Sequence, residues 1–174
     1  MHPLFHPLFI EYCAYFNGNE DYFECHEVLE EYWKEVAPGE KLHSLVGYVQ
    51  LATGMYHWRR ENFNGADRIF QKAINNFKSN KNSPYFDYVY FEQLIADMQL
   101  QHKRITAHEK FTRIKIPINH PELHIAVLDK IIATPPLDPH FLLNKHMLRD
   151  RSDIIALREV NKLKNTNDKT SRNQ

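Results

Sequence analysis

Apolar residues recur at intervals of three and four along most of the chain, which is the spacing of one face of an α-helix. Only 5 glycines interrupt the 174 residues. The pattern predicts an all-α protein: a helical bundle or orthogonal stack of helical hairpins with a C-terminal helical extension. The predicted helices span about 8–16, 20–36, 42–61, 65–77, 85–105, 122–133 and 140–164.

Turn and capping residues mark the ends of these helices. The segment Asn17–Asn19 ends the first helix, and Pro38–Gly39 ends the second. Asn62 or Asn64 is the expected cap of the fourth helix, and Pro121 suits the first turn of the sixth. The loops are short, so consecutive helices are expected to pack as neighbours.

The segment FTRIKIPI, residues 111–118, breaks the helical pattern. Its isoleucines alternate with other residues before a proline, which is typical of an extended strand-like segment. We therefore expect a helical core domain at 1–108 and an extension at 109–165 that crosses and packs on the core. The polar tail at 166–174 has no apolar anchor and is predicted to be disordered.

The second predicted helix carries two polar residues at the edge of an apolar face. His26 and Glu30 are one turn apart, close enough to interact. Trp33 is predicted to be a core anchor and not a ligand platform. On a helical wheel, the apolar face comprises Tyr22, Cys25, Leu29, Tyr32, Trp33 and Val36. The outer face comprises Glu27, Glu31, Lys34 and Glu35.

The third predicted helix carries a matching polar edge. Its core face is predicted to bury Leu42, Leu45, Val49, Ala52 and Tyr56. A short loop makes the second and third helices antiparallel neighbours, so their polar edges are expected to meet. The resulting candidate ligand-binding or polar cluster consists of His26, Glu30, Gln50, His57 and Arg60.

A half-buried carboxylate such as Glu30 needs a partner, and three kinds of partner fit. In a structural cluster, Glu30 pairs with Arg60 or a histidine and fixes the register of the helices. In a metal site, His26, Glu30 and His57 bind a divalent metal ion with open positions for water, as a metal-assisted hydrolase or other small enzyme requires. The third is a small-ligand or acid–base site.

The sequence lacks the motifs of several kinds of enzyme. The run HEVLE differs from the zincin helix because Glu30 stands where that motif has histidine. No phosphate-binding loop, dinucleotide fingerprint or nucleophile elbow is present. Cys25 is adjacent to His26, but neighbouring helical residues diverge, so a packed thiol is expected.

Charge and composition limit the binding partners and the cellular location that the sequence predicts. Lys and Arg (22) equal Asp and Glu (22), so no global field draws the chain to nucleic acid or to an anionic membrane. The two cysteines form no C-x-x-C pair, and no run reaches the length of a membrane span. The N-terminus lacks a basic leading region, so no signal peptide is expected. These features predict a cytoplasmic protein.

Three runs of the sequence resemble a known family. YFECHEVLEEYW, then Gln50 and Ala52, then YHWRRENFNGADRIF follow one another as in the domain-of-unknown-function family numbered 309, over about residues 17–73. Cys25 stands where that family usually has alanine, and NKHMLRDRSDII is similar to a C-terminal element of its longer Firmicute members. The resemblance implies an all-helical bacterial protein and supplies no activity.

The remaining features favour an interaction or small-ligand-binding module. Glu27, Glu31 and Glu35 form an acidic outer face, and the sequence around 145–151 is basic, so a protein partner or a homo-oligomer is expected. Gly54 and Phe70 fall at the offsets of the small and aromatic positions of a tetratricopeptide hairpin. That match is too partial to predict a tetratricopeptide array.

Overall fold

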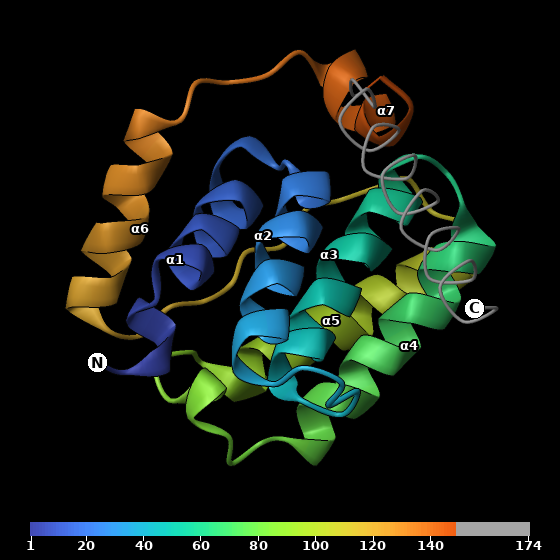
Figure 1. Ribbon diagram of the computed structural model, residues 1–174. Coiled ribbons are helices and arrows are strands. Elements are labelled where there is room, and N and C mark those ends of the chain that lie inside the picture. Colours follow the sequence, from blue (N-terminus) through green and yellow to red (C-terminus); the bar gives the residue numbers. More distant parts are fainter. Residues whose placement is uncertain (149–174) are drawn as a thin grey trace, which may run out of the picture. The chain divides into compact units, whose positions relative to one another are not determined.

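Seven α-helices account for most of the described part of the chain, residues 1–148 of a computed structural model (Figure 1). Within these residues there is no β-strand, only an isolated bridge between Val89 and Ile118. The all-α prediction is therefore confirmed. The helices are α1 Pro7–Ala14, α2 Tyr22–Val36, α3 Ser44–Arg59, α4 Phe63–Ser79, α5 Phe91–Thr106, α6 Pro121–Ala133 and α7 Pro139–Leu148.

Side-chain caps fix where α2 and α4 begin. The Asp21 carboxylate accepts a hydrogen bond from the Glu24 N–H at 3.1 Å. Asn62 accepts one from the Gly65 N–H at 3.1 Å, so Asn62 rather than Asn64 caps α4. Both bonds satisfy an N–H group that has no partner inside the first turn of a helix.

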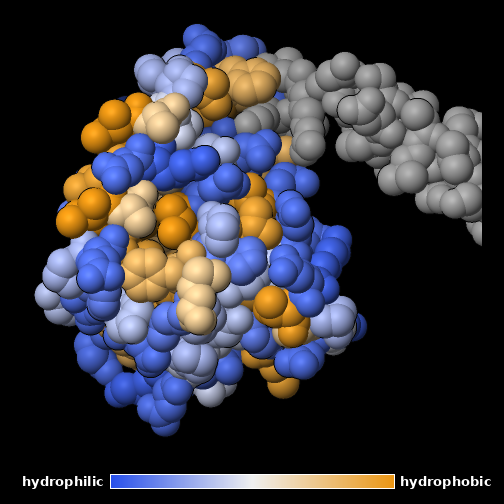
Figure 2. All heavy atoms as spheres, turned by 60° about the vertical axis from the view of Figure 1, so that its left-hand side comes forward, coloured by the Kyte–Doolittle hydropathy of each residue, from blue (hydrophilic) through white to orange (hydrophobic). Residues whose placement is uncertain are grey.

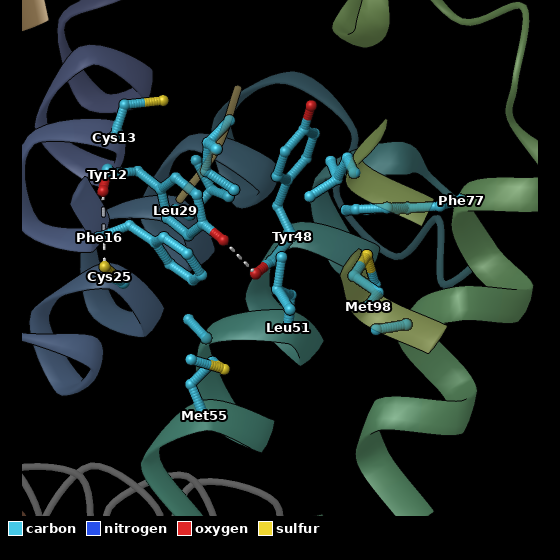
Figure 3. Packing of buried hydrophobic residues seen from close by; sticks show 14 of the residues in the cluster. Tyr12, Cys13, Phe16, Cys25, Leu29, Tyr48, Leu51, Met55, Phe77 and Met98 are labelled. Atoms are coloured by element: carbon cyan, nitrogen blue, oxygen red, sulfur yellow. Dashed lines mark hydrogen bonds between the residues drawn. The ribbon is translucent and has the colours of Figure 1, made fainter. Parts of the chain in front are cut away.

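The helix α3 lies at the centre of the bundle. It packs between α2 and α4, while α1 packs on α2 and α5 on α4. The Tyr12 hydroxyl donates to the Tyr48 carbonyl at 2.8 Å (Figure 3). The Tyr48 hydroxyl in turn donates to the Tyr85 carbonyl, also at 2.8 Å. Ten α3 residues are buried: Ser44, Leu45, Gly47, Tyr48, Leu51, Ala52, Gly54, Met55, Tyr56 and Trp58.

Two glycines allow α3 and α4 to approach closely. A Cβ atom at Gly54 would lie 2.5 Å from the Phe70 ring, and one at Gly47 would lie 2.7 Å from the Phe77 ring. Real carbon atoms do not come this close without a shift of one helix. The small-and-aromatic pairing expected for Gly54 and Phe70 is therefore a direct packing contact.

The segment between α5 and α6 returns across the core in an extended form. Asn17 holds it through its side-chain amide, which donates to the Ile116 carbonyl at 3.0 Å and accepts from the Ile116 N–H at 2.7 Å. The buried Gln101 side chain donates to the Thr112 carbonyl at 3.0 Å. These bonds satisfy backbone groups that no sheet partner satisfies, and the segment leads into α6, which packs on α1.

Two predicted helix starts and one predicted burial are wrong. Leu42 is 85% exposed because α3 begins only at Ser44, so Leu42 lies in the loop. Val36 is 45% exposed at the last residue of α2, where the core no longer covers the helix. The fifth helix begins at Phe91 and not near 85, because Pro84–Phe86 forms a separate 3₁₀ turn.

Met1–Asn144 form one compact unit. The division into a core at 1–108 and an extension at 109–165 stays a prediction. The predicted tail at 166–174 and most of the basic stretch at 145–151 lie outside the described residues. None of the helices in the described part of the chain is both long enough and apolar enough to cross a bilayer.

The close approach at Gly54 gives a stability prediction. Gly54→Val should lower the free energy of unfolding by roughly 2 kcal/mol or more, because the added side chain meets the Phe70 ring and valine brings little gain in helix propensity. Thr53→Val at the neighbouring, half-buried position is the matched control and should change stability by less than about 1 kcal/mol. Denaturant unfolding measures both, and equal effects would contradict the packing assignment.

Candidate functional site

A hollow of about 270 Å³ lies between α2 and α3, beside the loop that joins them. We call it the α2–α3 hollow. Glu30 and Trp33 of α2 form one wall, and Val46, Val49 and Gln50 of α3 form the other. Its full lining is Glu30, Trp33, Lys41, Val46, Val49 and Gln50.

Both oxygens of the Glu30 carboxylate contact cationic or basic groups of α2. Lys34 Nζ lies 2.6 Å from Oε1, and His26 Nε2 lies 3.3 Å from Oε2. The Glu30 carboxylate raises the pKa of Lys34, first through this hydrogen bond. His26 and Glu30 are one-third exposed, as their place at the edge of the apolar face predicts. Lys34 is 63% exposed, in agreement with its predicted place on the outer face, and its ammonium group contacts Glu30 from there.

Gln50 is the least satisfied polar group of the hollow. Its Oε1 atom is buried and has no hydrogen-bond partner among the described residues. An amide oxygen buried without a donor costs about 1–3 kcal/mol. A ligand that donates a hydrogen bond in the hollow would remove this cost.

Trp33 combines packing with exposure to the hollow. Its ring is partly buried against the core, and its Nε1–H donates to the Glu40 carbonyl at 3.0 Å. Trp33 therefore packs on the core, as predicted, but less deeply than a core anchor, and it also borders the hollow beside Glu30. That it is not a ligand platform stays a prediction. The fully buried tryptophan is Trp58, 1% exposed, whose Nε1–H donates to the Glu109 carbonyl.

Two larger hollows adjoin the same loop. One of about 460 Å³ shares Lys41 and Gln50 with the α2–α3 hollow and continues over α4. Another of about 560 Å³ lies between the loop and the turn at Pro84. The 560 Å³ hollow also has a carboxylate and aromatic rings in its lining, those of Glu40, His43 and Tyr85, whereas the 460 Å³ hollow has neither. Of these three hollows, the α2–α3 hollow is the one that combines a carboxylate and an aromatic ring with Gln50.

His57 and Arg60 lie near the C-terminal end of α3. His57 Nδ1 is 3.3 Å from the Asn62 amide nitrogen, and the Arg60 guanidinium lies over the Tyr56 ring at 5.5 Å. Seven helical residues separate Gln50 from His57, which is about 10 Å along the axis. The structure therefore places His26 beside Glu30, and Glu30 and Gln50 in the lining of one hollow. A single site that uses all five predicted residues stays a prediction.

A metal ion would need at least three suitable ligands in one place. In residues 1–148, no group of three His, Cys, Asp or Glu side chains is arranged to hold one. The metal candidates His26, Glu30 and His57 stay a prediction.

A second polar centre surrounds the π-helical turn at Tyr15–Asn19. The Arg59 guanidinium lies over the Tyr22 ring at 4.7 Å and donates to the Glu20 carbonyl at 2.8 Å. Arg113 donates to the Asn17 carbonyl at 2.7 Å. Burial lowers the pKa of Arg59, and neighbouring oxygens oppose that shift. The arginines satisfy carbonyls freed by the turn, a structural role.

Cys25 is a packed thiol, as expected. It is fully buried, and its Sγ donates to the Tyr12 carbonyl at 3.5 Å (Figure 3). Burial is the largest cause that raises its pKa well above the ordinary value. A thiol that stays protonated is a poor nucleophile.

The exposed apolar residues of α6 form a separate feature. Ile125, Leu128 and Ile132 follow one stripe of the helix and are 56%, 42% and 83% exposed. Figure 2 shows the side of the molecule on which α6 lies in Figure 1, with hydrophobic side chains in patches between hydrophilic ones. The stripe offers no charge or hydrogen-bonding group that would select a ligand.

Comparisons with known proteins identify the family of this chain. A family model described as "Domain of unknown function (DUF309)" matches residues 9–69. The chain is also 35% identical over 158 residues to the uncharacterized protein YpuF of Bacillus subtilis (strain 168), covering 87% of this chain and 91% of that one. The chain belongs to the DUF309 family. The matched region includes α2 and α3, and hence both walls of the hollow.

No solved structure matches the chain significantly. The family itself is described only as a domain of unknown function, so it assigns no activity to the hollow.

Sequence reasoning missed three residues of the site. Lys34 was assigned to the outer face, although the four-residue spacing from Glu30 predicts an ion pair. Trp33 was assigned to the core because it lies on the apolar face of the helical wheel. A wheel does not show where a neighbouring loop leaves a side chain uncovered. Lys41 lies in that loop, where no periodic signal exists.

The two tryptophans give a second stability prediction. Trp58→Ala should lower the free energy of unfolding by roughly 3–5 kcal/mol, the usual cost of removing a fully buried aromatic side chain. Trp33→Ala should cost clearly less, about half of that or under, because its ring is only partly buried. Urea unfolding of both variants decides, and a larger loss for Trp33→Ala would contradict the burial assignment.

Proposed function

We propose that this protein is a recognition module that binds a cationic side chain or small amine in the α2–α3 hollow. The proposal starts from the buried Oε1 atom of Gln50, which has no donor among the described residues, and from the place of Gln50 beside Glu30 in the lining of one hollow. Two acceptors in one hollow match a ligand with several N–H donors, such as an ammonium or guanidinium group.

The indole of Trp33 supports the same class of ligand. A cation over the face of a tryptophan ring is stabilised by about 0.5–2 kcal/mol, depending on how well water is excluded. Val46 and Val49 supply aliphatic surface for the carbon chain that carries the charge. A volume of about 270 Å³ suits one side chain or a small amine better than a large cofactor.

Lys34 shows that this carboxylate accepts an ammonium group. Its Nζ lies 2.6 Å from Glu30, yet its side chain is 63% exposed and attached to a flexible stem. An incoming cation would therefore compete with Lys34 and would not require an unpaired carboxylate. The exposed acidic residues of α2, including Glu31 and Glu35, extend the favourable field around the hollow.

Binding of agmatine, a four-carbon chain with an amine at one end and a guanidinium at the other, tests the proposal. Saturable binding with a Kd of roughly 0.1–1 mM is expected for so small a ligand. Glu30→Gln and Gln50→Leu should each weaken binding about tenfold, because each removes an acceptor. Lys34→Gln should strengthen it by removing the internal competitor. Titration calorimetry or the Trp33 indole N–H signal in NMR measures the Kd.

Glu31→Gln is the matched control, since Glu31 neighbours Glu30 on α2 but lies exposed outside the hollow. It should leave the Kd within about twofold of the wild type. Butylurea, a neutral ligand of similar length, should bind far more weakly than agmatine. Equal effects of the Glu30 and Glu31 substitutions, or the absence of saturable binding, would reject the proposal.

A further inference from the structure

Histidines start four helical segments of this fold. In each case, ring atom Nδ1 accepts a hydrogen bond from a backbone N–H at the beginning of the segment. The pairs are His2 with Leu4, His6 with Leu8 and His43 with Leu45, each at 3.2 Å, and His120 with Leu123 at 3.4 Å. The second, third and fourth of these histidines cap α1, α3 and α6.

Three of these histidines precede a proline. His2, His6 and His120 are each followed by a proline that occupies the first position of its helical segment. Proline there lacks only an N–H that the helix does not use, and its fixed φ suits the first turn. The repeated His-Pro dipeptide is therefore one helix-starting device used three times.

An imidazole cap differs from the usual caps in its response to acid. Serine, threonine and asparagine keep their acceptor oxygen at any physiological pH. A ring nitrogen that accepts a hydrogen bond carries no proton, so each capping ring must be neutral with its proton on Nε2. Protonation removes the acceptor and puts a positive charge at the positive end of the helix dipole.

We propose that the histidine caps make the fold acid-responsive: protonation of His43 and His120 releases the first turns of α3 and α6. This device does not depend on any ligand of the α2–α3 hollow. It operates near pH 6, where histidine titrates, whereas a Ser or Asn cap would be insensitive there.

His43 and His120 are the responsive members because of the groups that face them. The His43 ring packs on the Tyr85 ring at 5.0 Å, and Glu40 is the acidic group near it. The His120 ring lies between the rings of Tyr88, at 4.2 Å, and Phe5, at 5.4 Å. Among the described residues, no carboxylate is within ion-pair distance of either ring.

The other two capping histidines, His2 and His6, each lie beside a carboxylate. His2 Nε2 lies 3.0 Å from the Asp87 carboxylate, and the ring contacts Tyr88 at 4.1 Å. His6 Nε2 lies 3.7 Å from the Glu35 carboxylate. The proposal is therefore confined to His43 and His120, whose rings have no carboxylate within ion-pair distance among the described residues.

The direction of the His43 effect follows from its environment. Burial lowers the pKa of His43 below its ordinary value, and Glu40 opposes this shift only in part. The unfolded chain therefore binds a proton at His43 more readily than the folded chain does. As the pH falls below the ordinary histidine pKa, near 6.5, the stability contributed by the neutral ring is progressively lost.

The response also reaches the α2–α3 hollow. His43 caps the helix whose first two turns carry Val46, Val49 and Gln50, three residues that line the hollow. Loosening of this turn in acid should weaken ligand binding. This consequence rests on the proposed function, whereas the stability effect does not.

The test compares thermal stability at about pH 7.5 and about pH 5 in the full chain. The variant His43→Asn with His120→Asn keeps a side-chain acceptor at both helix starts but cannot be protonated. On acidification, the melting temperature of this variant should fall by about half as much as that of the wild type, or less. His124→Asn is the matched control, because His124 is exposed on α6 and caps no helix. It should behave as the wild type. An equal loss in the double variant would overturn the proposal.

NMR of the wild-type protein gives an independent check that needs no variant. At neutral pH the ring nitrogens of His43 and His120 should report a bare Nδ1, and the amide protons of Leu45 and Leu123 should shift as these rings titrate. A protonated Nδ1 at neutral pH would overturn the proposal. Agmatine titration at both pH values distinguishes the cation site from the acid response of the histidine caps. If agmatine binds at neither pH, the cation site is rejected and the acid response is not.

Discussion

The burial of α3 on nearly every side is the constraint on which the rest of the structure depends. Because α2 and α4 pack against it, α3 can carry few polar side chains, and its neighbours approach it through glycines at positions 47 and 54. The hydroxyls of Tyr12 on α1 and Tyr48 on α3 each donate to a backbone carbonyl, which satisfies polar groups without water. In such surroundings, a polar atom left without a partner is costly and therefore informative.

Gln50 is such a group, and its position explains why the candidate site lies between α2 and α3. The loop of residues 37–43 leaves the first turns of α3 uncovered on one side, so Gln50 and Trp33 line a hollow that the core does not fill. The Glu30 carboxylate, held by His26 and Lys34, adds negative charge at the edge of this hollow. A DUF309 protein thus has an acceptor-rich site beside an aromatic ring, although the family description names no ligand.

The sequence pattern predicted the all-α class, the approximate helices and the Asn62 cap, because these depend on local spacing and side-chain hydrogen bonds. It also predicted the interaction of His26 with Glu30, which the helix repeat determines. It failed where tertiary surroundings decide. A helical wheel assumes one buried face, whereas α3 is buried nearly all round, and the wheel placed Leu42 and Trp33 too deep. The histidine caps gave no recognised signal, because imidazole is not among the usual capping groups.

A structure of the protein with agmatine bound is the direct test of the cation site in the α2–α3 hollow. We expect an amine or guanidinium nitrogen within hydrogen-bond distance of Gln50 Oε1, roughly 2.7–3.2 Å, with the Trp33 ring against the ligand and Lys34 displaced from Glu30. Agmatine bound elsewhere, with Gln50 Oε1 still lacking a donor, would contradict it.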